Sequence, residues 1–435
     1  MAKRKIKSNV KSALIIIVLC ALIFGVFYLL NSTSSSTKVS SIHSDAKTYK
    51  SSRCTAFYPD SKAGRQLAKQ VCNDVSDKNE HVYDYSLIPY GDYYMVSYGN
   101  GYQYYADQSF KPLVISESDE EGLRIVADYL RIAYKKNQPK TYYDSSFIVN
   151  TTYEEINFEG ITYEIENENL ICHLPDYDLP IEVPLKYMQT HIGMNFGYEN
   201  EDYVKPVYID DEHPVIALTF DDGPMFWYPP GESSSQLITD LLYKYDASAT
   251  FFVSGTCLES RDSWSDYEVY TYLKQSISQG NEYASYIQDH DYYLTDYYTA
   301  DEIERAIKGP ANTLEQLIGY KVQLCRPPGG VFSNDIQNVS PYPLILWTID
   351  SDDWELDTGE KISNSVKTYM DDDLLETGDI ILFHDIYFET ADAIEILLPQ
   401  MIDKGYQLVT VSEMLNYMNI DLETLGYYYN ANYYE

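Results

Sequence analysis

The sequence predicts an α/β protein whose C-terminal half forms a (β/α) barrel of about seven strands. From Pro214 onward, short apolar runs alternate with helical stretches, which is typical of parallel strands joined by crossover helices. Unusual polar residues follow several of these runs, and active sites in such barrels lie where the strands end. We expect a small α+β region and an N-terminal transmembrane helix to precede the barrel.

The composition is that of a folded protein. The chain has 435 residues, of which 45% are apolar and 23% are charged, which suits two or three globular domains. Its 67 acidic and 31 basic side chains give a net charge of −36, which disfavours binding to nucleic acid. There are 6 cysteines and no CxxC pair, so a zinc finger is excluded and any metal site must use histidines and carboxylates.

The N-terminus is predicted to anchor the protein in a membrane. Residues 1–12 are basic, and no charged residue occurs from Ala13 to Leu30, a run just long enough to span the hydrocarbon core. The basic flank predicts a cytoplasmic N-terminus, so we expect the globular part to lie outside the cell membrane. A cleaved signal peptide is the alternative. The Ser/Thr-rich residues 31–50 suit a flexible linker.

Residues 51–208 are predicted to form an α+β region without a catalytic constellation. The segment between His81 and Tyr105 is strand-like, and its Asn100-Gly101 pair is typical of a tight hairpin turn. The further predicted elements are helices over Ser61–Val75 and Glu120–Lys135 and short strands within Phe147–Val183.

The sequence leaves open whether two of the cysteines form a disulfide bridge. Cys54 and Cys72 flank the first predicted helix and could be bridged in an oxidising compartment. Two unpaired thiols are the alternative. Cys172, Cys257 and Cys325 are expected to be ordinary core cysteines.

Seven apolar runs are the candidate barrel strands. They are Val215–Phe220, Ala249–Val253, Glu282–Tyr286, Val322–Cys325, Pro343–Ile349, Asp379–Phe383 and Gln407–Val411. The polar residues that follow them are Asp221, Asp222, His290, Arg326, Asp350, Asp353, His384 and Asp385. Because strand ends meet at one edge of a barrel, this coincidence predicts a catalytic site there.

Four segments carry a resemblance to a known family. They are Thr219-Phe220-Asp221-Asp222-Gly223-Pro224, Ala249-Thr250-Phe251-Phe252-Val253, Gly280-Asn281-Glu282 and Arg326-Pro327-Pro328-Gly329-Gly330. Together they resemble the polysaccharide deacetylase family, the NodB-homology domain of the carbohydrate esterases, which has a distorted (β/α) barrel. The resemblance covers Pro214 to Met418, and we place this domain at residues 209–420 with a Tyr-rich tail at 421–435. The layout ahead of it is similar to that of membrane-anchored peptidoglycan N-acetylglucosamine deacetylases.

The resemblance implies a separate catalytic role for each of several site residues. Hydrolysis of an acetamide needs an activated water, a stabiliser for the oxyanion and an acid for the departing amine. Asp221 would be the general base, with its carboxylate held by Arg326. His384 would be the general acid, oriented by Asp353. The expected substrate pocket is formed by Trp354, Leu382, Pro328 and Gly329.

The same resemblance implies a divalent metal, zinc or cobalt. Asp222 and His290 match two of its three protein ligands, and the metal would lower the pKa of a bound water. At the third position this chain has Tyr286 where the family has a histidine. A phenol loses its proton near pH 10, so it is an uncommon zinc ligand, and Tyr286 puts the activity in question. A smaller departure is Gly329, which stands where the family usually has a tyrosine.

Three functions remain open from the sequence. The first is an N-deacetylase that acts on cell-wall glycan, either peptidoglycan or chitin-like amino sugars. The second is a deacetylase fold that has lost catalysis and binds wall glycan, because Tyr286 replaces a metal ligand. The third is an O-acetyl esterase, which would use the same residues on another polysaccharide.

Overall fold

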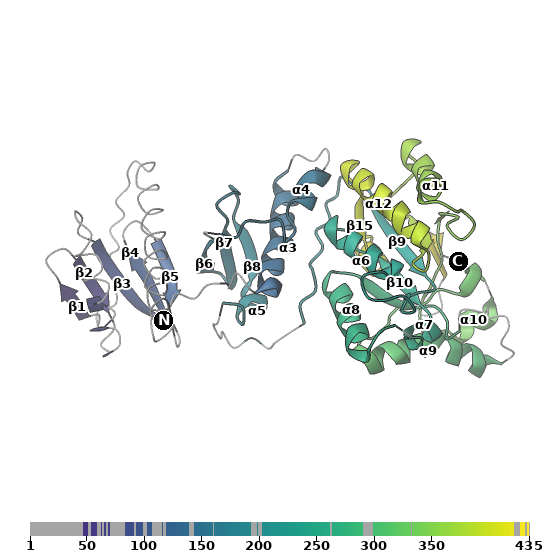
Figure 1. The fold of residues 1–435 in the computed structure, drawn as a ribbon, viewed down its shortest axis with the longest axis horizontal. Coiled ribbons are helices and arrows are strands. Elements are labelled where there is room, and N and C mark those ends of the chain that lie inside the picture. Colours follow the sequence, from purple (N-terminus) through teal and green to yellow (C-terminus); the bar gives the residue numbers. More distant parts are fainter. Residues whose placement is uncertain are drawn as a thin grey trace, which may run out of the picture. The chain divides into compact units, whose positions relative to one another are not determined.

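The fold was analysed in a computed structural model (Figure 1). The structure describes residues 47–50, 54–58, 83–90, 93–98, 102–106, 115, 119–138, 143–159, 161–192, 198, 202–261, 263–289, 299–331, 333–421, 427–430 and 433–434, and five positions between 62 and 69. Among the described helices, none combines the length and apolar character needed to cross a bilayer. The predicted membrane segment at residues 13–30 lies outside the described residues.

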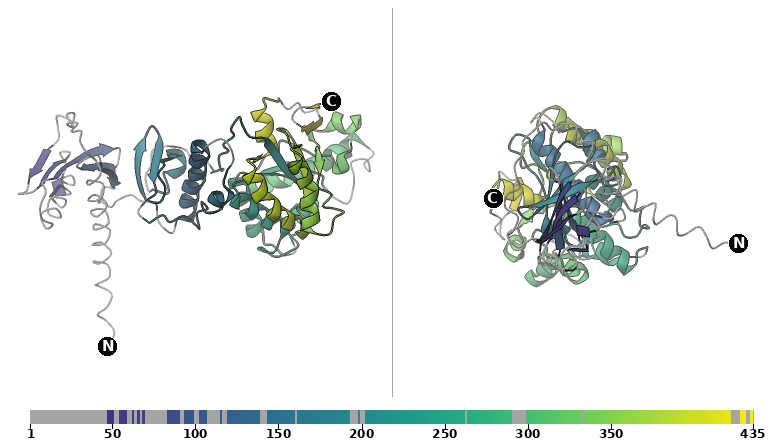
Figure 2. Two further views of the ribbon diagram at one scale, coloured as in Figure 1. Left: turned by 90° about the horizontal axis from the view of Figure 1, so that it is seen from above. Right: turned by 90° about the vertical axis from the view of Figure 1, so that its left-hand side faces the viewer.

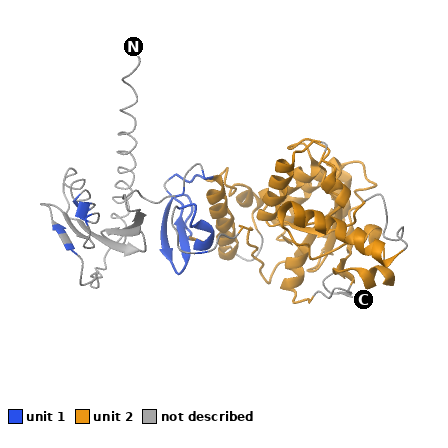
Figure 3. Ribbon diagram, turned by 90° about the horizontal axis from the view of Figure 1, so that it is seen from below, with its two compact units in different colours: residues 1–119, 157–180, 184–198 blue, residues 120–156, 181–183, 199–435 orange. Residues whose placement is uncertain are grey.

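Contacts divide the chain into two units (Figure 3). The first unit comprises residues 1–119, 157–180 and 184–198. The second, which we call the barrel unit, comprises residues 120–156, 181–183 and 199–435. The stretch that we placed at 51–208 is therefore shared between the two units.

The first unit contains a five-stranded sheet in the order β1-β2-β3-β4-β5. Its strands are β1 (Lys47–Lys50), β2 (Cys54–Tyr58), β3 (Tyr83–Tyr90), β4 (Tyr93–Tyr98) and β5 (Tyr102–Ala106). The predicted hairpin is confirmed, because β4 and β5 pair antiparallel with Tyr98 opposite Tyr102. The described positions between 62 and 69 are helical, whereas Cys72 of the possible bridge lies outside the described residues.

A second hairpin of this unit joins β6 (Thr162–Glu166) to β7 (Asn169–His173). Asn167 and Glu168 form its turn with φ angles of 48° and 66°, the positive values that tight two-residue hairpin turns require. The short helix α5 (Leu185–Met188) follows.

The barrel unit begins with α3 (Glu120–Asn137), which confirms the predicted helix, followed by α4 (Ser145–Val149) and later β8 (Ile181–Pro184). The short strands predicted within Phe147–Val183 are confirmed as β6, β7 and β8, but Phe147 itself lies in α4. Asp144 accepts a hydrogen bond from the Ser146 amide and so caps a helical turn there.

The barrel sheet is parallel and has the order β11-β10-β9-β14-β13, with β15 also paired to β9. Its strands are β9 (Val215–Asp221), β10 (Thr250–Val253), β11 (Glu282–Ser285), β13 (Ile349–Asp350), β14 (Ile380–His384) and β15 (Gln407–Val409). Five of the seven predicted runs are thus strands, and their observed ends differ from the predicted ones by at most two residues.

The other two runs differ from the prediction. Val322–Cys325 forms no strand; Cys325 alone bridges Ser285 on one side and Leu344 on the other. Two prolines follow at 327 and 328, and they have no N–H to continue the pairing. The run Pro343–Ile349 divides into β12 (Leu344–Ile345) and β13, so the barrel is distorted at this point.

The Tyr-rich C-terminus is part of the barrel unit, contrary to our expectation of a tail. Tyr427–Asn430 forms β16, which pairs parallel with β12, and Tyr433–Tyr434 forms β17. The Tyr427 side chain is fully buried, and its hydroxyl accepts a hydrogen bond from the Ser333 amide. Burial of two large aromatic rings, Tyr427 and Tyr428, supplies the reason for the pairing.

Helices cover the outer face of the sheet, and α6 and α12 lie side by side there (Figures 1 and 2). They are α6 (Ser234–Lys244), α7 (Gly255–Glu259), α8 (Asp266–Ser278), α9 (Ala300–Ile318), α10 (Asn334–Val339), α11 (Gly359–Asp371), α12 (Phe388–Asp403) and α13 (Val411–Tyr417). Capping boxes fix the first turns of α8, α9 and α13.

Candidate active site

The alternation of side chains along β9 places Asp221 inside the barrel. Phe220 stacks on Phe251 and Phe383 of the two neighbouring strands and joins the core beneath the helices. The residues on either side of Phe220 therefore face the opposite way. Thr219 and Asp221 both contact Arg326 there, and Asp221 is only 2% exposed.

Arg326 holds Asp221 from within the barrel. Its Nη1 donates to Asp221 Oδ1 at 2.8 Å and to the Thr219 hydroxyl at 2.9 Å. Its Nε and Nη2 donate to the carbonyls of Ile345 and Leu346, respectively, at 3.1 Å each. The guanidinium is fully buried, so these contacts fix its position as well as its charge.

Burial raises the pKa of Asp221 to about 6, although the charges of Arg326 and His384 act to lower it. The carboxylate is therefore ionised at neutral pH and still close enough in pKa to accept a proton. This is the state that a general base requires.

His384 and Asp353 form the second pair. His384 closes β14 directly opposite Asp221 in the parallel register, so the two side chains end adjacent strands. Its Nδ1 lies 2.7 Å from Asp353 Oδ1, and its backbone N–H donates to Asp353 Oδ2 at 2.7 Å. The Thr390 hydroxyl donates to the same Oδ2 at 2.7 Å.

This pairing determines the charge of the imidazole. Burial alone would lower the pKa of His384, but the hydrogen bond and charge of Asp353, with Asp221 and Asp222, raise it to about 9. The ring is therefore protonated at neutral pH. Because Nδ1 is engaged by Asp353, Nε2 is the nitrogen left to deliver a proton.

Asp222 follows in a turn with a positive φ of 75°, which is unusual for a residue with a side chain. Its carbonyl accepts a hydrogen bond from the Ser254 hydroxyl at 3.1 Å. The carboxylate influences the pKa of Asp221, Tyr286 and His384, so it belongs to the same group of charges.

Tyr286 lies in this site as well. Its side chain is 6% exposed, and burial, followed by the charges of Asp221 and Asp222, raises the pKa of the phenol well above 10. The backbone N–H of Gly329 lies near the phenol and acts to lower this pKa.

The described residues do not provide a complete metal site. Among them, no three His, Cys, Asp or Glu side chains converge to hold an ion. Asp222 supplies one carboxylate, and Tyr286 supplies a protonated phenol in place of an imidazole. His290, the remaining predicted ligand, lies outside the described residues.

The predicted pocket residues occupy different environments. Trp354 is 57% exposed beside Asp353, whereas Leu382 is buried on β14 opposite Thr219. Pro328 is buried and Gly329 has a φ of 65°, which only glycine adopts readily.

Sequence reasoning missed three contacts at the site. Thr390 donates to Asp353, Trp347 lies 5.4 Å from the Arg326 guanidinium, and the Tyr387 ring lies 6.0 Å from the His384 ring. Tyr387 also has its pKa raised by burial and by the charges of Asp222 and Asp353. Its position three residues after His384 was the only signal in the sequence.

Comparison with known proteins places these residues in a family. A family model described as Polysaccharide deacetylase matches residues 209–341. The chain is 32% identical over 208 residues to peptidoglycan-N-acetylmuramic acid deacetylase PdaC of Bacillus subtilis (strain 168), a match that covers 47% of this chain and 40% of PdaC. The solved structure of PdaC matches at 32% identity and a TM-score of 0.41, over 48% of this chain and 93% of that one.

A shorter relative is matched over most of its length. The chain is 30% identical over 218 residues to a peptidoglycan-N-acetylglucosamine deacetylase of Bacillus cereus, which covers 48% of this chain and 92% of that protein. By contrast, the chain spans 40% of PdaC and 52% of the deacetylase PgdA of Listeria monocytogenes, about half the length of these relatives. With the motif residues gathered at the strand ends, the chain belongs to the polysaccharide deacetylase family.

Proposed function

We propose that this protein is a hydrolase that removes N-acetyl groups from cell-wall glycan. One observation carries the proposal: two buried pairs, Asp221 with Arg326 and His384 with Asp353, end adjacent strands in direct register. The named activities of the relatives from Bacillus subtilis and Bacillus cereus support peptidoglycan as the substrate class.

The chemistry follows from the two protonation states. Asp221, with its pKa near 6, takes a proton from a water that attacks the acetyl carbonyl carbon. The carbon–nitrogen bond then breaks, and His384, protonated below its pKa of about 9, gives its proton to the departing nitrogen. Acetate and a free amino sugar are the products. Arg326 and Asp353 keep the base charged and the acid protonated.

Members of this family typically depend on a divalent metal. We propose zinc or cobalt at Asp222 and His290, with Tyr286 as a poor third ligand. Since the buried phenol keeps its proton in the absence of a cation, we expect weaker metal binding than three usual ligands would give.

A second function, glycan binding without catalysis, is favoured by Tyr286 alone. The phenol occupies the place of a ligand, and its raised pKa means that it keeps its proton. Both effects would reduce turnover without preventing glycan binding.

The experiment compares the full chain with Tyr286→His and Tyr286→Phe, each with zinc or cobalt added. Acetate release from peptidoglycan and chitin oligosaccharides is measured beside the metal content. Acetate from the native protein supports the deacetylase proposal. Acetate from Tyr286→His alone, with a rise in bound metal, supports the non-catalytic function. Tyr286→Phe separates loss of the phenol oxygen from gain of the imidazole.

We also propose that the protein is held in the cell membrane by residues 13–30 with the glycan-binding part outside. The uncharged run and its basic flank support this. Extracellular protease added to intact cells should release or degrade the barrel unit, and protection of that unit would contradict the proposal.

A further inference from the structure

Four buried oxygen atoms lie together next to the turn that follows β9 and contains Asp222 and Gly223. We call this turn the catalytic turn. They are both carboxylate oxygens of Asp385 and the hydroxyls of Tyr272 and Tyr283, and none makes a hydrogen bond of ordinary geometry with the residues that the structure describes, although Ser235 and Gly223 lie near the carboxylate. The three side chains are 1%, 7% and 1% exposed. The charge of Asp385 contributes to the raised pKa of both phenols, so the groups share one region.

Asp385 lies directly against the turn that carries the two site aspartates. A Cβ added to Gly223 would stand 2.0 Å from its Oδ1 and 2.2 Å from its Oδ2. The Asp385 carbonyl accepts hydrogen bonds from the hydroxyls of Ser234 and Ser235 at the start of α6. The main chain of Asp385 is therefore fixed, while its carboxylate is pressed against the Gly223 backbone.

Buried polar atoms in native proteins are nearly always satisfied by protein groups or by ordered water. A buried water makes two to four hydrogen bonds, which four neighbouring oxygens can provide. A metal ion is the less suitable occupant, because among the described residues Asp385 belongs to no group of three Asp, Glu, His or Cys side chains that could hold one.

Water also has a route to this region. A groove lies between α6 and α8, and its lining includes Thr239, Tyr272 and Ser276. Thr239 lies near the Tyr272 hydroxyl and Ser276 near the Tyr283 hydroxyl, and each lowers the pKa of that phenol. The groove thus reaches the Tyr272 side chain and the two residues that lie beside the phenols.

We propose that Asp385, Tyr272 and Tyr283 form a buried hydration site behind the catalytic turn, and that Asp385 is a positioning residue for Gly223 and the aspartates before it. The turn needs such support because Asp222 holds a positive φ of 75°. The hydration site stands by itself, whereas the positioning role rests on the proposed deacetylase function.

The hydration site is tested by counting long-lived internal waters with oxygen-isotope magnetic relaxation dispersion of the full chain. Tyr283→Phe and Tyr272→Phe each remove one oxygen and keep the ring. We expect either variant to lose at least one long-lived water. The control is Tyr406→Phe, a buried tyrosine of the same unit, which should keep the native count. An unchanged count in both test variants would overturn the site.

The positioning role is tested with Asp385→Ala and Asp385→Asn. Asp385→Ala should lower kcat about tenfold or more, because a small displacement of reacting groups is costly. The acidic limb of its kcat/KM profile should move, since a shifted turn changes the contact of Asp221 with Arg326. Asp385→Asn should restore most of the rate, because its amide can still bind the water.

The outcomes are separable. A loss of folded protein would scale the whole pH profile without moving the limb, and this result would overturn the positioning role. If the native chain releases no acetate, the deacetylase proposal fails, yet the water count still decides the hydration site.

Discussion

At the residue scale, two buried partners set the protonation of the groups proposed to move protons. Arg326 keeps Asp221 ionised although burial favours its neutral form. Asp353 keeps His384 protonated although burial favours the neutral imidazole. The pKa of the base thus lies below that of the acid, so both are in their working states at neutral pH.

The first prediction is the pH profile of kcat/KM for the native chain. Activity requires Asp221 without its proton, so the rate should rise as pH increases through about 6. It also requires His384 with its proton, so the rate should fall as pH increases through about 9. Initial rates of acetate release across this range check both limbs. A profile that keeps rising above pH 9 would remove His384 as the acid.

The second prediction concerns Asp353→Asn. Without the carboxylate, the main cause that raises the pKa of His384 is lost, and the alkaline limb should move to lower pH. The rate near neutral pH should fall by about 100-fold or more, since the ring also loses its orientation. Asp350→Asn is the matched control, because Asp350 lies on the same connection but does not hydrogen-bond to the imidazole. Equal losses in both variants would contradict the orienting role.

Most charged residues of the site could be predicted because each lies in a motif whose chemistry is specific. Thr390 and Trp347 could not, since a threonine in the first turn of α12 and a tryptophan between strands carry no local sign of a partner. The burial of the Tyr286 phenol near carboxylates could not be predicted either, because the sequence shows only that a tyrosine stands where the family has a histidine.

At the element scale, strands with long apolar runs were predictable and single bridges were not. β9 and β14 are buried along most of their length, so their runs are unambiguous. Cys325 forms one isolated β-bridge with Ser285 and another with Leu344. A single paired residue gives no alternation of apolar and polar residues that the sequence could show. The strand β16 was missed because its tyrosines also suit an exposed tail.

The third prediction tests β16. Tyr427→Ala should lower the free energy of unfolding by about 3–5 kcal/mol, since a fully buried aromatic side chain is lost. Tyr427→Phe should cost about 1 kcal/mol, because only the hydrogen bonds with Ser333 are removed. Urea-induced unfolding followed by tryptophan fluorescence measures both. Native stability of Tyr427→Ala would mean that the C-terminus does not support the barrel.

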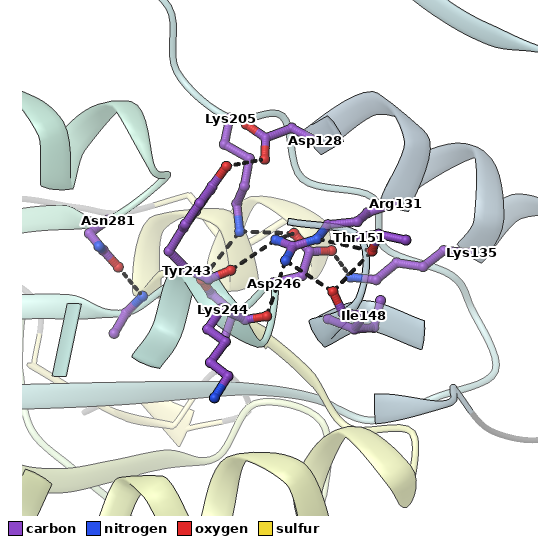
Figure 4. Close-up of polar contacts among 12 residues, drawn as sticks. Asp128, Arg131, Lys135, Ile148, Thr151, Lys205, Tyr243, Lys244, Asp246 and Asn281 are labelled. Atoms are coloured by element: carbon purple, nitrogen blue, oxygen red, sulfur yellow. Dashed lines mark hydrogen bonds and ion pairs between the residues drawn. The ribbon is translucent and has the colours of Figure 1, made fainter. Parts of the chain in front are cut away.

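At the scale of the whole molecule, the barrel unit is larger than the segment matched by the family model. That match covers residues 209–341, whereas the unit also includes residues 120–156. Figure 4 shows how α3 is joined to the turn after α6. The buried Arg131 donates to the carbonyls of Tyr243 and Lys244 at 2.8 and 3.1 Å.

The final prediction concerns Asp246, the acidic centre of this contact. Its carboxylate lies 2.6 Å from Lys135 and 3.1 Å from Lys205. Burial alone would raise its pKa, but these cations and Arg131 lower it well below the usual value. This stability is therefore present above the unfolded pKa and lost as pH falls towards the folded one. Asp246→Asn should cost about 3–5 kcal/mol in urea unfolding at neutral pH. The control is Asp357→Asn, which removes one partner of an exposed ion pair with Lys361 and should have a far smaller effect. Equal effects would mean that apolar contacts alone hold α3 to the barrel.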